Sequence, residues 1–148
     1  MRESLFKGKR KDNGEWVEGG YFQEPYTDSV FIIVWNSTGL GYNEFIEIIP
    51  ETLCQYTGCT DKNGKMIWEN DICHTHGIND DICVIRYGEY KDNSQKFHIG
   101  FYTDWRDFKD LFRKDLGFWV NECELKVIAN AIDKPNLMEV KNESSIIL

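Results

Sequence analysis

Hydrophobic and polar residues alternate along most of this chain, which is the pattern of β-strands that bury one face. Turn-forming residues interrupt the alternation at intervals of about eight to twelve positions. Many short strands at this spacing predict a mainly β fold, a small antiparallel barrel or roll. The predicted strands cover residues 15–22, 30–35, 42–49, 66–68, 71–76, 81–87, 96–102, 118–120 and 124–131.

The run at residues 30–35 has no polar position until its end, so it predicts a core strand that is covered on both faces. The run at residues 96–102 alternates, with Phe97, Ile99 and Phe101 on one side, and predicts one packed face.

One segment has the spacing of an amphipathic helix. Its apolar residues recur at three- and four-residue steps, with charged residues between them. These apolar residues are Trp105, Phe108, Leu111 and Phe112. We therefore expect one short amphipathic helix over residues 104–116, ended by Gly117.

The clearest turn signal is Asn63-Gly64. Asn and Gly adopt left-handed backbone angles more readily than other residues, so the pair predicts a tight hairpin with both residues at positive φ. This hairpin joins the region of Thr60 to residues 66–68.

The chain has 148 residues, enough for one compact folding unit with a genuine core. Hydrophobic residues make up 41% of it, which excludes a disordered chain. Within this unit we expect an N-terminal β layer at residues 1–50 and a β-barrel domain at residues 51–148.

The formal net charge of −8 disfavours double-stranded DNA and anionic membranes and favours protein partners. Residues 2–11 depart from this balance, because they hold five basic residues and one acidic residue. Such a basic arm can contact an anion or an acidic partner surface, and it can equally be a solvated edge. The basic residues are Arg2, Lys7, Lys9, Arg10 and Lys11.

No apolar stretch resembles a signal peptide or spans a bilayer, so we expect a cytoplasmic protein that does not enter a membrane. The five cysteines have no disulfide-framework spacing, and free thiols are expected in a reducing compartment. They are Cys54, Cys59, Cys73, Cys83 and Cys123.

Three blocks of this sequence resemble the YopX family, small proteins encoded by bacteriophages and prophages. The strongest block lies at residues 55–72, and the others lie at residues 6–19 and 127–137. Asn70 and Ala129 stand where the family usually has glycine. The positions that match the family signature are Tyr56, Thr57, Gly58, Asp61, Asn63, Gly64, Glu69 and Asp71.

This resemblance implies a Src-homology-3-like barrel in the carboxy-terminal part, with the amino-terminal strands packed beside it. It also implies a phage or prophage protein in a bacterial host cell. It supplies no catalytic residues, so the signature positions are interpreted as structural.

A candidate metal site lies around Cys73, His74 and His76, with Cys83 and His98 as further ligand types. Two histidines that are two positions apart on a strand point to the same side, but Cys73 points to the other side. There is also no Cys-x-x-Cys pair. The pattern therefore favours no metal ion and no other cofactor.

Glu69 and Asp71 would share one side of an extended segment, where paired carboxylates can act as acid and base. A structural task is sufficient for Asp71, since an Asp after a turn accepts hydrogen bonds from nearby backbone N–H groups. No cysteine has a nucleophile motif. We expect no enzymatic activity.

The leading hypothesis is a non-enzymatic protein that binds another protein or associates with itself, including as a homo-oligomer. One alternative is a single-stranded nucleic-acid-binding accessory protein that combines the basic arm with aromatic residues. Another is a small metalloprotein. The aromatic residues considered for stacking are Trp16, Tyr21, Trp35, Tyr56, Trp68, Tyr87 and Tyr102.

Overall fold

The computed structural model describes residues 5–36, 39–75, 81–109 and 113–139. The chain folds as two compact units, Met1–Tyr56 (unit 1) and Thr57–Leu148 (unit 2). The boundary between the units lies inside the strand Cys54–Thr60, whereas the sequence pattern placed it at residue 50.

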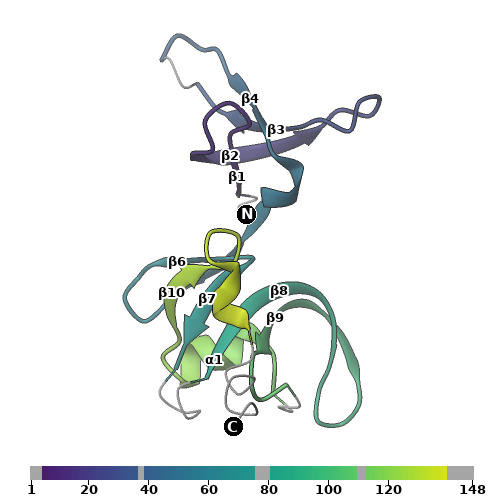
Figure 1. Ribbon diagram of the computed structural model, residues 1–148, viewed down its shortest axis with the longest axis vertical. Coiled ribbons are helices and arrows are strands. Elements are labelled where there is room, and N and C mark those ends of the chain that lie inside the picture. Colours follow the sequence, from purple (N-terminus) through teal and green to yellow (C-terminus); the bar gives the residue numbers. More distant parts are fainter. Residues whose placement is uncertain (1–4, 37–38, 76–80, 110–112, 140–148) are drawn as a thin grey trace, which may run out of the picture. The chain divides into compact units, whose positions relative to one another are not determined.

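Unit 1 is an antiparallel sheet with the strand order β4-β3-β2-β1-β5 (Figure 1). Strand β5 begins in unit 1 beside β1 and continues into unit 2, where β6 is its neighbour. The elements are β1 (Phe6–Lys9), β2 (Trp16–Gln23), β3 (Val30–Val34), β4 (Glu44–Ile48), the 3-10 turn η1 (Pro50–Thr52) and β5 (Cys54–Thr60).

The core of unit 1 lies on one face of this sheet. Alternate positions of β3 and β4 are buried there, namely Val30, Ile32, Ile46 and Ile48. Gly8 on β1 is required by close packing, because a Cβ at this position would collide with the side chain of Ile48. Strand β1 was not among the predicted strands, since its two lysines hide the short apolar pattern.

The end of β1 also approaches β4. Arg10 and Ile48 form an isolated bridge, and the Lys11 N–H donates to the Glu47 carbonyl at 3.0 Å. The sheet therefore curls, but its edge strands do not pair with each other among the described residues.

Unit 2 contains a four-stranded antiparallel sheet with the order β10-β7-β8-β9. In Figure 1, β8 and β9 form a long hairpin that extends beyond the rest of this sheet. The elements are β6 (Met66–Trp68), β7 (Asp71–His74), β8 (Ile82–Lys91), β9 (Phe97–Trp105), the helix α1 (Leu116–Glu122), β10 (Lys126–Asn130) and the 3-10 turn η2 (Pro135–Met138).

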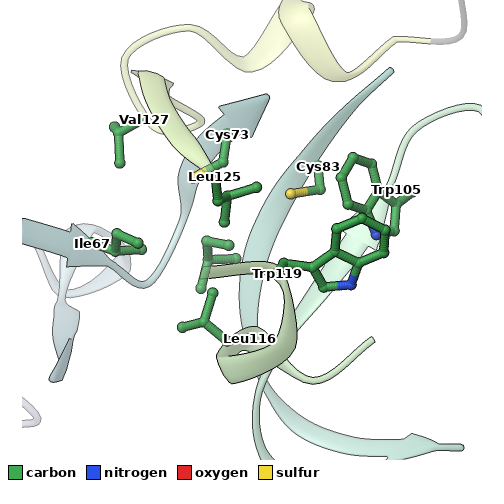
Figure 2. Close-up of a cluster of buried hydrophobic side chains, with 9 residues drawn as sticks. Ile67, Cys73, Cys83, Trp105, Leu116, Trp119, Leu125 and Val127 are labelled. Carbon is green, nitrogen blue, oxygen red and sulfur yellow. The ribbon is translucent and has the colours of Figure 1, made fainter. Parts of the chain in front are cut away.

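The core of unit 2 lies between the sheet and α1 (Figure 2). The rings of Trp105 and Trp119 lie 4.8 Å apart at their centroids. Both indole N–H groups have acceptors, at 2.9 Å from Thr103 Oγ1 and 2.9 Å from the Arg113 carbonyl. The buried side chains are Ile67, Cys73, Cys83, Ile85, Trp105, Leu116, Trp119, Leu125 and Val127.

The mainly β prediction is confirmed, and a strand overlaps each predicted range except 118–120. Barrel closure is not found in the part of the chain that the structure describes, because β9 and β10 remain the separate edges of their sheet. The Src-homology-3-like arrangement stays a prediction.

The position predicted for the helix is wrong. Residues 104 and 105 end β9, residues 106–109 form bends and turns, and 110–112 lie outside the described residues. The helix begins at Leu116, because the Asp115 side chain accepts a hydrogen bond from the Phe118 N–H and caps it. Residues 118–120 are therefore helical and not a strand, and Gly117 lies inside the helix.

Two further expectations are corrected. At the β5–β6 turn only Gly64 has positive φ, and Asn63 does not. In β3, Val30 and Ile32 are buried, whereas Phe31 and Ile33 are only half-buried and Trp35 is exposed, so this strand is not covered on both faces.

Candidate functional site

The signature carboxylate Asp61 ties the β5–β6 turn to β10. Its Oδ1 accepts hydrogen bonds from the Asn63 and Lys65 N–H groups, and its Oδ2 accepts one from the Val127 N–H, each at 2.9 Å. Burial alone would raise the pKa of this carboxyl, but the three hydrogen bonds outweigh it and hold the pKa below its usual value. As an anion, Asp61 therefore holds the backbone of the β5–β6 turn and of β10 in place.

The neighbouring signature positions also engage backbone. Thr57 Oγ1 donates to the Ile67 carbonyl at 2.7 Å and accepts from the Cys59 N–H at 3.1 Å. Gly58 lies between them at φ 86°, where a side chain would be strained. The Tyr56 N–H donates to the Leu5 carbonyl in unit 1.

Glu69 and Asn70 form a turn between β6 and β7, so Glu69 does not share a strand with Asp71. The buried Asp71 accepts hydrogen bonds from the Trp68 N–H at 2.8 Å and from Asn130 Nδ2 at 3.2 Å. Asn70 has φ 72°, the left-handed conformation in which glycine is usual.

A further buried carboxylate, Asp81, was not singled out from the sequence. It accepts hydrogen bonds from the N–H groups of Ile82, Asp107 and Phe108 at 2.8–3.2 Å. Arg106 Nε lies 3.9 Å from it, and Arg106 Nη1 donates to the Leu137 carbonyl at 3.0 Å. Asp107 and Phe108 follow Asp81 by 26 and 27 positions, so no local motif reveals these two partners.

The candidate metal ligands that the structure describes do not form a cluster of three or more. Cys73 on β7 faces Cys83 on β8, and both thiols are buried. A hydrogen bond with Cys83, together with burial, raises the pKa of the Cys73 thiol well above its usual value. His98 instead contacts Asp92 at 2.8 Å, and His76 lies outside the described residues. Within the described ranges no group of three or more His, Cys, Asp or Glu side chains could hold a metal ion.

Most of the basic arm is engaged by neighbouring side chains. Arg10 pairs with Asp12 at 2.9 Å, and its hydrogen bond lowers the pKa of that carboxyl. Lys11 pairs with Glu47 at 3.2 Å. The ammonium groups of Lys7 and Lys9 lie 4.7 and 5.5 Å from the ring centroid of Trp16.

The exposed face of the unit 1 sheet carries an aromatic cluster, which we call the outer aromatic face. It is formed by Phe22, Phe31, Ile33, Trp35 and Phe45. Phe22 lies on β2, opposite Phe31 of β3, and Ile33 lies opposite Phe45 of β4. The ring of Phe22 is 6.4 Å from each of the other two phenyl rings, and Phe22 and Phe45 are 43% and 57% exposed.

Sequence reasoning missed this face, although its signal is present. Phe31, Ile33 and Phe45 occupy the positions that alternate with the buried residues of β3 and β4, and period-two alternation assigns them to the opposite face. Trp35 joins them because a Cβ on Gly20 would come within 2.7 Å of its ring, which therefore lies over the glycine.

Two depressions accompany these surfaces. One of about 350 Å³ adjoins the outer aromatic face and is lined by residues 10–12 and 44–47. The other, of about 400 Å³, lies in unit 2 between Tyr90, His98 and residues 113–115. In each depression basic and acidic groups are interspersed, and neither contains a nucleophile next to a base.

The seven aromatic residues considered for nucleic-acid stacking do not share one face. Trp68 is buried, and Tyr87 and Tyr102 lie on opposite faces of the β8–β9 hairpin, since Tyr87 faces Phe101 and Tyr102 faces Arg86. No helix of the described residues is long and apolar enough to cross a membrane.

Comparison with known proteins places the chain in a family. Among solved structures it is similar to protein EF1440 from Enterococcus faecalis, with a TM-score of 0.52 and 22% sequence identity over 94% of this chain and 100% of that chain. At this identity the likeness shows the fold alone. No curated protein matches the chain. Residues 5–139 match the family model described as YopX protein, so the chain belongs to the YopX family.

Proposed function

We propose that this chain is a phage- or prophage-encoded accessory protein that acts in the cytoplasm of a bacterial host by binding another protein. In this proposal it catalyses no reaction, and the outer aromatic face is the surface that contacts the partner. The signature residues of unit 2 have a structural role.

The observation that carries this proposal is the exposure of contiguous aromatic side chains on a regular sheet. A soluble protein gains free energy by burying such side chains, and contiguous exposed apolar patches commonly mark interaction sites. Aromatic residues are also enriched at the centres of protein interfaces. The Lys11–Glu47 pair lies at the margin of this patch and supplies a polar rim.

The outer aromatic face also indicates what kind of partner surface it would bind. The rings rest on paired strands, so little conformational entropy is lost on binding. The chain carries a net charge of −8, which favours a partner whose apolar patch is bordered by basic groups. The single-stranded nucleic-acid alternative has less support, because Arg10 and Lys11 already pair with carboxylates.

The test uses a double variant, Phe22→Ser with Phe45→Ser, and a matched control, Tyr26→Ser. Tyr26 is 92% exposed on the turn that follows β2 and is not one of the residues of the outer aromatic face. Each protein is used to recover partners from host cells, and a recovered protein is then purified and titrated calorimetrically. We expect saturable binding that the control retains and the double variant weakens at least about tenfold, as loss of interface aromatics commonly does.

Equal binding by the double variant and the wild type would remove the outer aromatic face from the proposal. Recovery of no specific protein by the wild-type chain would remove the protein-binding function itself.

A further inference from the structure

One face of the β8–β9 hairpin begins in the core of unit 2 and ends in solvent. At the base of the hairpin, Ile85 and Trp105 belong to the buried cluster that contacts α1. Farther out on the same face, the side chains of Tyr87, Phe97 and Ile99 are 54%, 61% and 76% exposed. In Figure 1 this part of the hairpin extends beyond the rest of the sheet. The described part of unit 2 therefore leaves an apolar surface open here.

The register of β8 and β9 places these side chains together. Tyr87 lies opposite Phe101, and their rings are 5.0 Å apart at the centroids. Every second facing pair of an antiparallel ladder is on the same face. Residues 114–116 run beside residues 101–103, so they border the base of this face and not its outer part. We call the outer part the hairpin face, formed by Tyr87 and the two facing pairs Glu89–Ile99 and Lys91–Phe97.

The hairpin face carries one charge of each sign. Glu89 and Lys91 are both exposed, and neither forms an ion pair with another described residue. The Lys91 ammonium group lies 4.9 Å from the ring centroid of Phe97. The chain as a whole has a net charge of −8, but this face is neutral. A face with one acid and one base is complementary to itself, which favours a second copy of the chain as its partner.

We propose that the hairpin faces of two copies pack against each other and form a two-fold symmetric dimer. The symmetry axis crosses the strands between the two outer facing pairs. Rotation about this axis brings Glu89 over Lys91 of the second copy and Ile99 over Phe97 of the second copy. Symmetry repeats each contact. Sheets that pack face to face lie about 10 Å apart, a gap that side chains of this length fill.

The size of the hairpin face fits a weak dimer. A large apolar side chain can bury roughly 150–250 Å², so the exposed fractions of Tyr87, Phe97 and Ile99 offer about 300–450 Å² on each copy. With Glu89 and Lys91 included, two copies bury about 1,000 Å² in total, which is near the lower limit for specific interfaces. We therefore expect a dissociation constant in the micromolar range.

The first experiment measures self-association by sedimentation equilibrium. At about 0.1 mM the wild-type chain of 17.4 kDa should approach twice this mass. Ile99→Ser removes an apolar contact at two places and should weaken the dimer at least about tenfold. The matched control is Ile128→Ser, because Ile128 is 46% exposed on β10 and is not part of the hairpin face. The control should dimerise like the wild type.

The second experiment tests the register by reversing charges. Glu89→Lys places an ammonium group opposite Lys91 of the second copy, and Lys91→Glu places a carboxylate opposite Glu89 of the second copy. Each variant alone should lose affinity about tenfold or more, because symmetry repeats the repulsion. An equimolar mixture of the two variants has opposite charges at both contacts. It should therefore form a heterodimer with an affinity close to that of the wild type.

A wild type that stays monomeric at this concentration overturns the proposal, including one whose hairpin face is covered by residues 140–148 of the same chain. A dimer that persists unchanged in Ile99→Ser overturns it, as does a mixture of the charge variants that fails to associate. Circular dichroism of every variant should match the wild type, since all substituted side chains are exposed. The outer aromatic face contributes no residue to the hairpin face, so either proposal can fail alone.

Discussion

The two units stabilise their folds in different ways. In unit 2 three carboxylates, Asp61, Asp71 and Asp81, are buried and accept hydrogen bonds from backbone N–H groups. Among the described residues of unit 1, Thr52 is the one buried polar side chain. Unit 1 is fixed by strand register and apolar packing, and several of its aromatic side chains remain outside the core.

This difference predicts which substitutions each unit tolerates. A buried carboxylate that satisfies several N–H groups cannot be replaced without leaving donors unpaired, so the loops of unit 2 depend on a few positions. Exposed aromatic residues of unit 1 have no such task. They can change with little effect on the fold, and the proposed function predicts a large effect on binding.

The largest expected effect follows Asp81→Ala. The substitution removes the acceptor of three N–H groups and the buried carboxylate beside Arg106, which keeps Asp107 at 3.4 Å as its remaining acidic partner. Breaking one partner of such a buried pair costs about 3–5 kcal/mol in the free energy of unfolding. Hydrogen exchange read separately for the two units should show the loss in unit 2. The exposed carboxylate Asp12 is the control, and Asp12→Ala should change the free energy of unfolding far less than Asp81→Ala does.

In unit 1 the corresponding change is Ile48→Ala. This side chain is fully buried beside Gly8, and the cavity that it leaves should cost about 3 kcal/mol. The same exchange measurement should now show the loss in residues 5–53. Equal losses in both units would show that they unfold together and would weaken the comparison.

A smaller effect is expected for Asp61→Asn, at about 2 kcal/mol in the free energy of unfolding. The side-chain NH₂ group of asparagine cannot accept a hydrogen bond, so a backbone N–H group that Asp61 now binds loses its acceptor. The pKa of Asp61 is lowered in the folded state. Its contribution is therefore complete above the unfolded-state pKa of about 4 and is lost as the pH falls through the lower folded-state value. Urea unfolding between neutral and acidic pH should show a shallower loss in the variant than in the wild type.

The smallest effect on stability is expected for Phe45→Ser on the outer aromatic face. A partly exposed side chain outside the core should change the free energy of unfolding by less than about 0.5 kcal/mol. Thermal unfolding measures this value. A loss comparable to that of Ile48→Ala would show that Phe45 is a core residue and would refute its assignment to a binding surface.

Local patterns predicted the strands well, because alternation is a property of neighbouring residues. The β3 and β4 ranges follow from Val30, Ile32, Ile46 and Ile48, and the β5–β6 hairpin follows from Gly64. The family signature was likewise visible as a continuous run. Its hydrogen bonds to Val127 and Asn130 were not, since they join distant parts of the chain.

The helix shows why spacing alone misleads. Trp105 and Phe108 have helical spacing, but Trp105 is the last residue of β9 and shares its buried side with Thr103. Asp104 and Trp105 pair with Val84 and Cys83 of β8, and this pairing holds the start of the predicted helix in an extended conformation. The outer aromatic face was missed for a related reason. Alternation along β3 shows that the strand has two sides, but the rest of the fold decides which side stays exposed.

The bond from Val127 to Asp61 joins residues 66 positions apart, and β10 pairs with β7 across a similar span. Neighbouring hairpins form within microseconds, but a contact this distant must first overcome the entropy of closing a long loop. Docking of β10 is therefore expected to limit the folding rate of unit 2. Until β10 docks, the backbone groups along one edge of β7 have no partner strand. Newly made YopX chains are therefore most prone to misassembly before β10 docks.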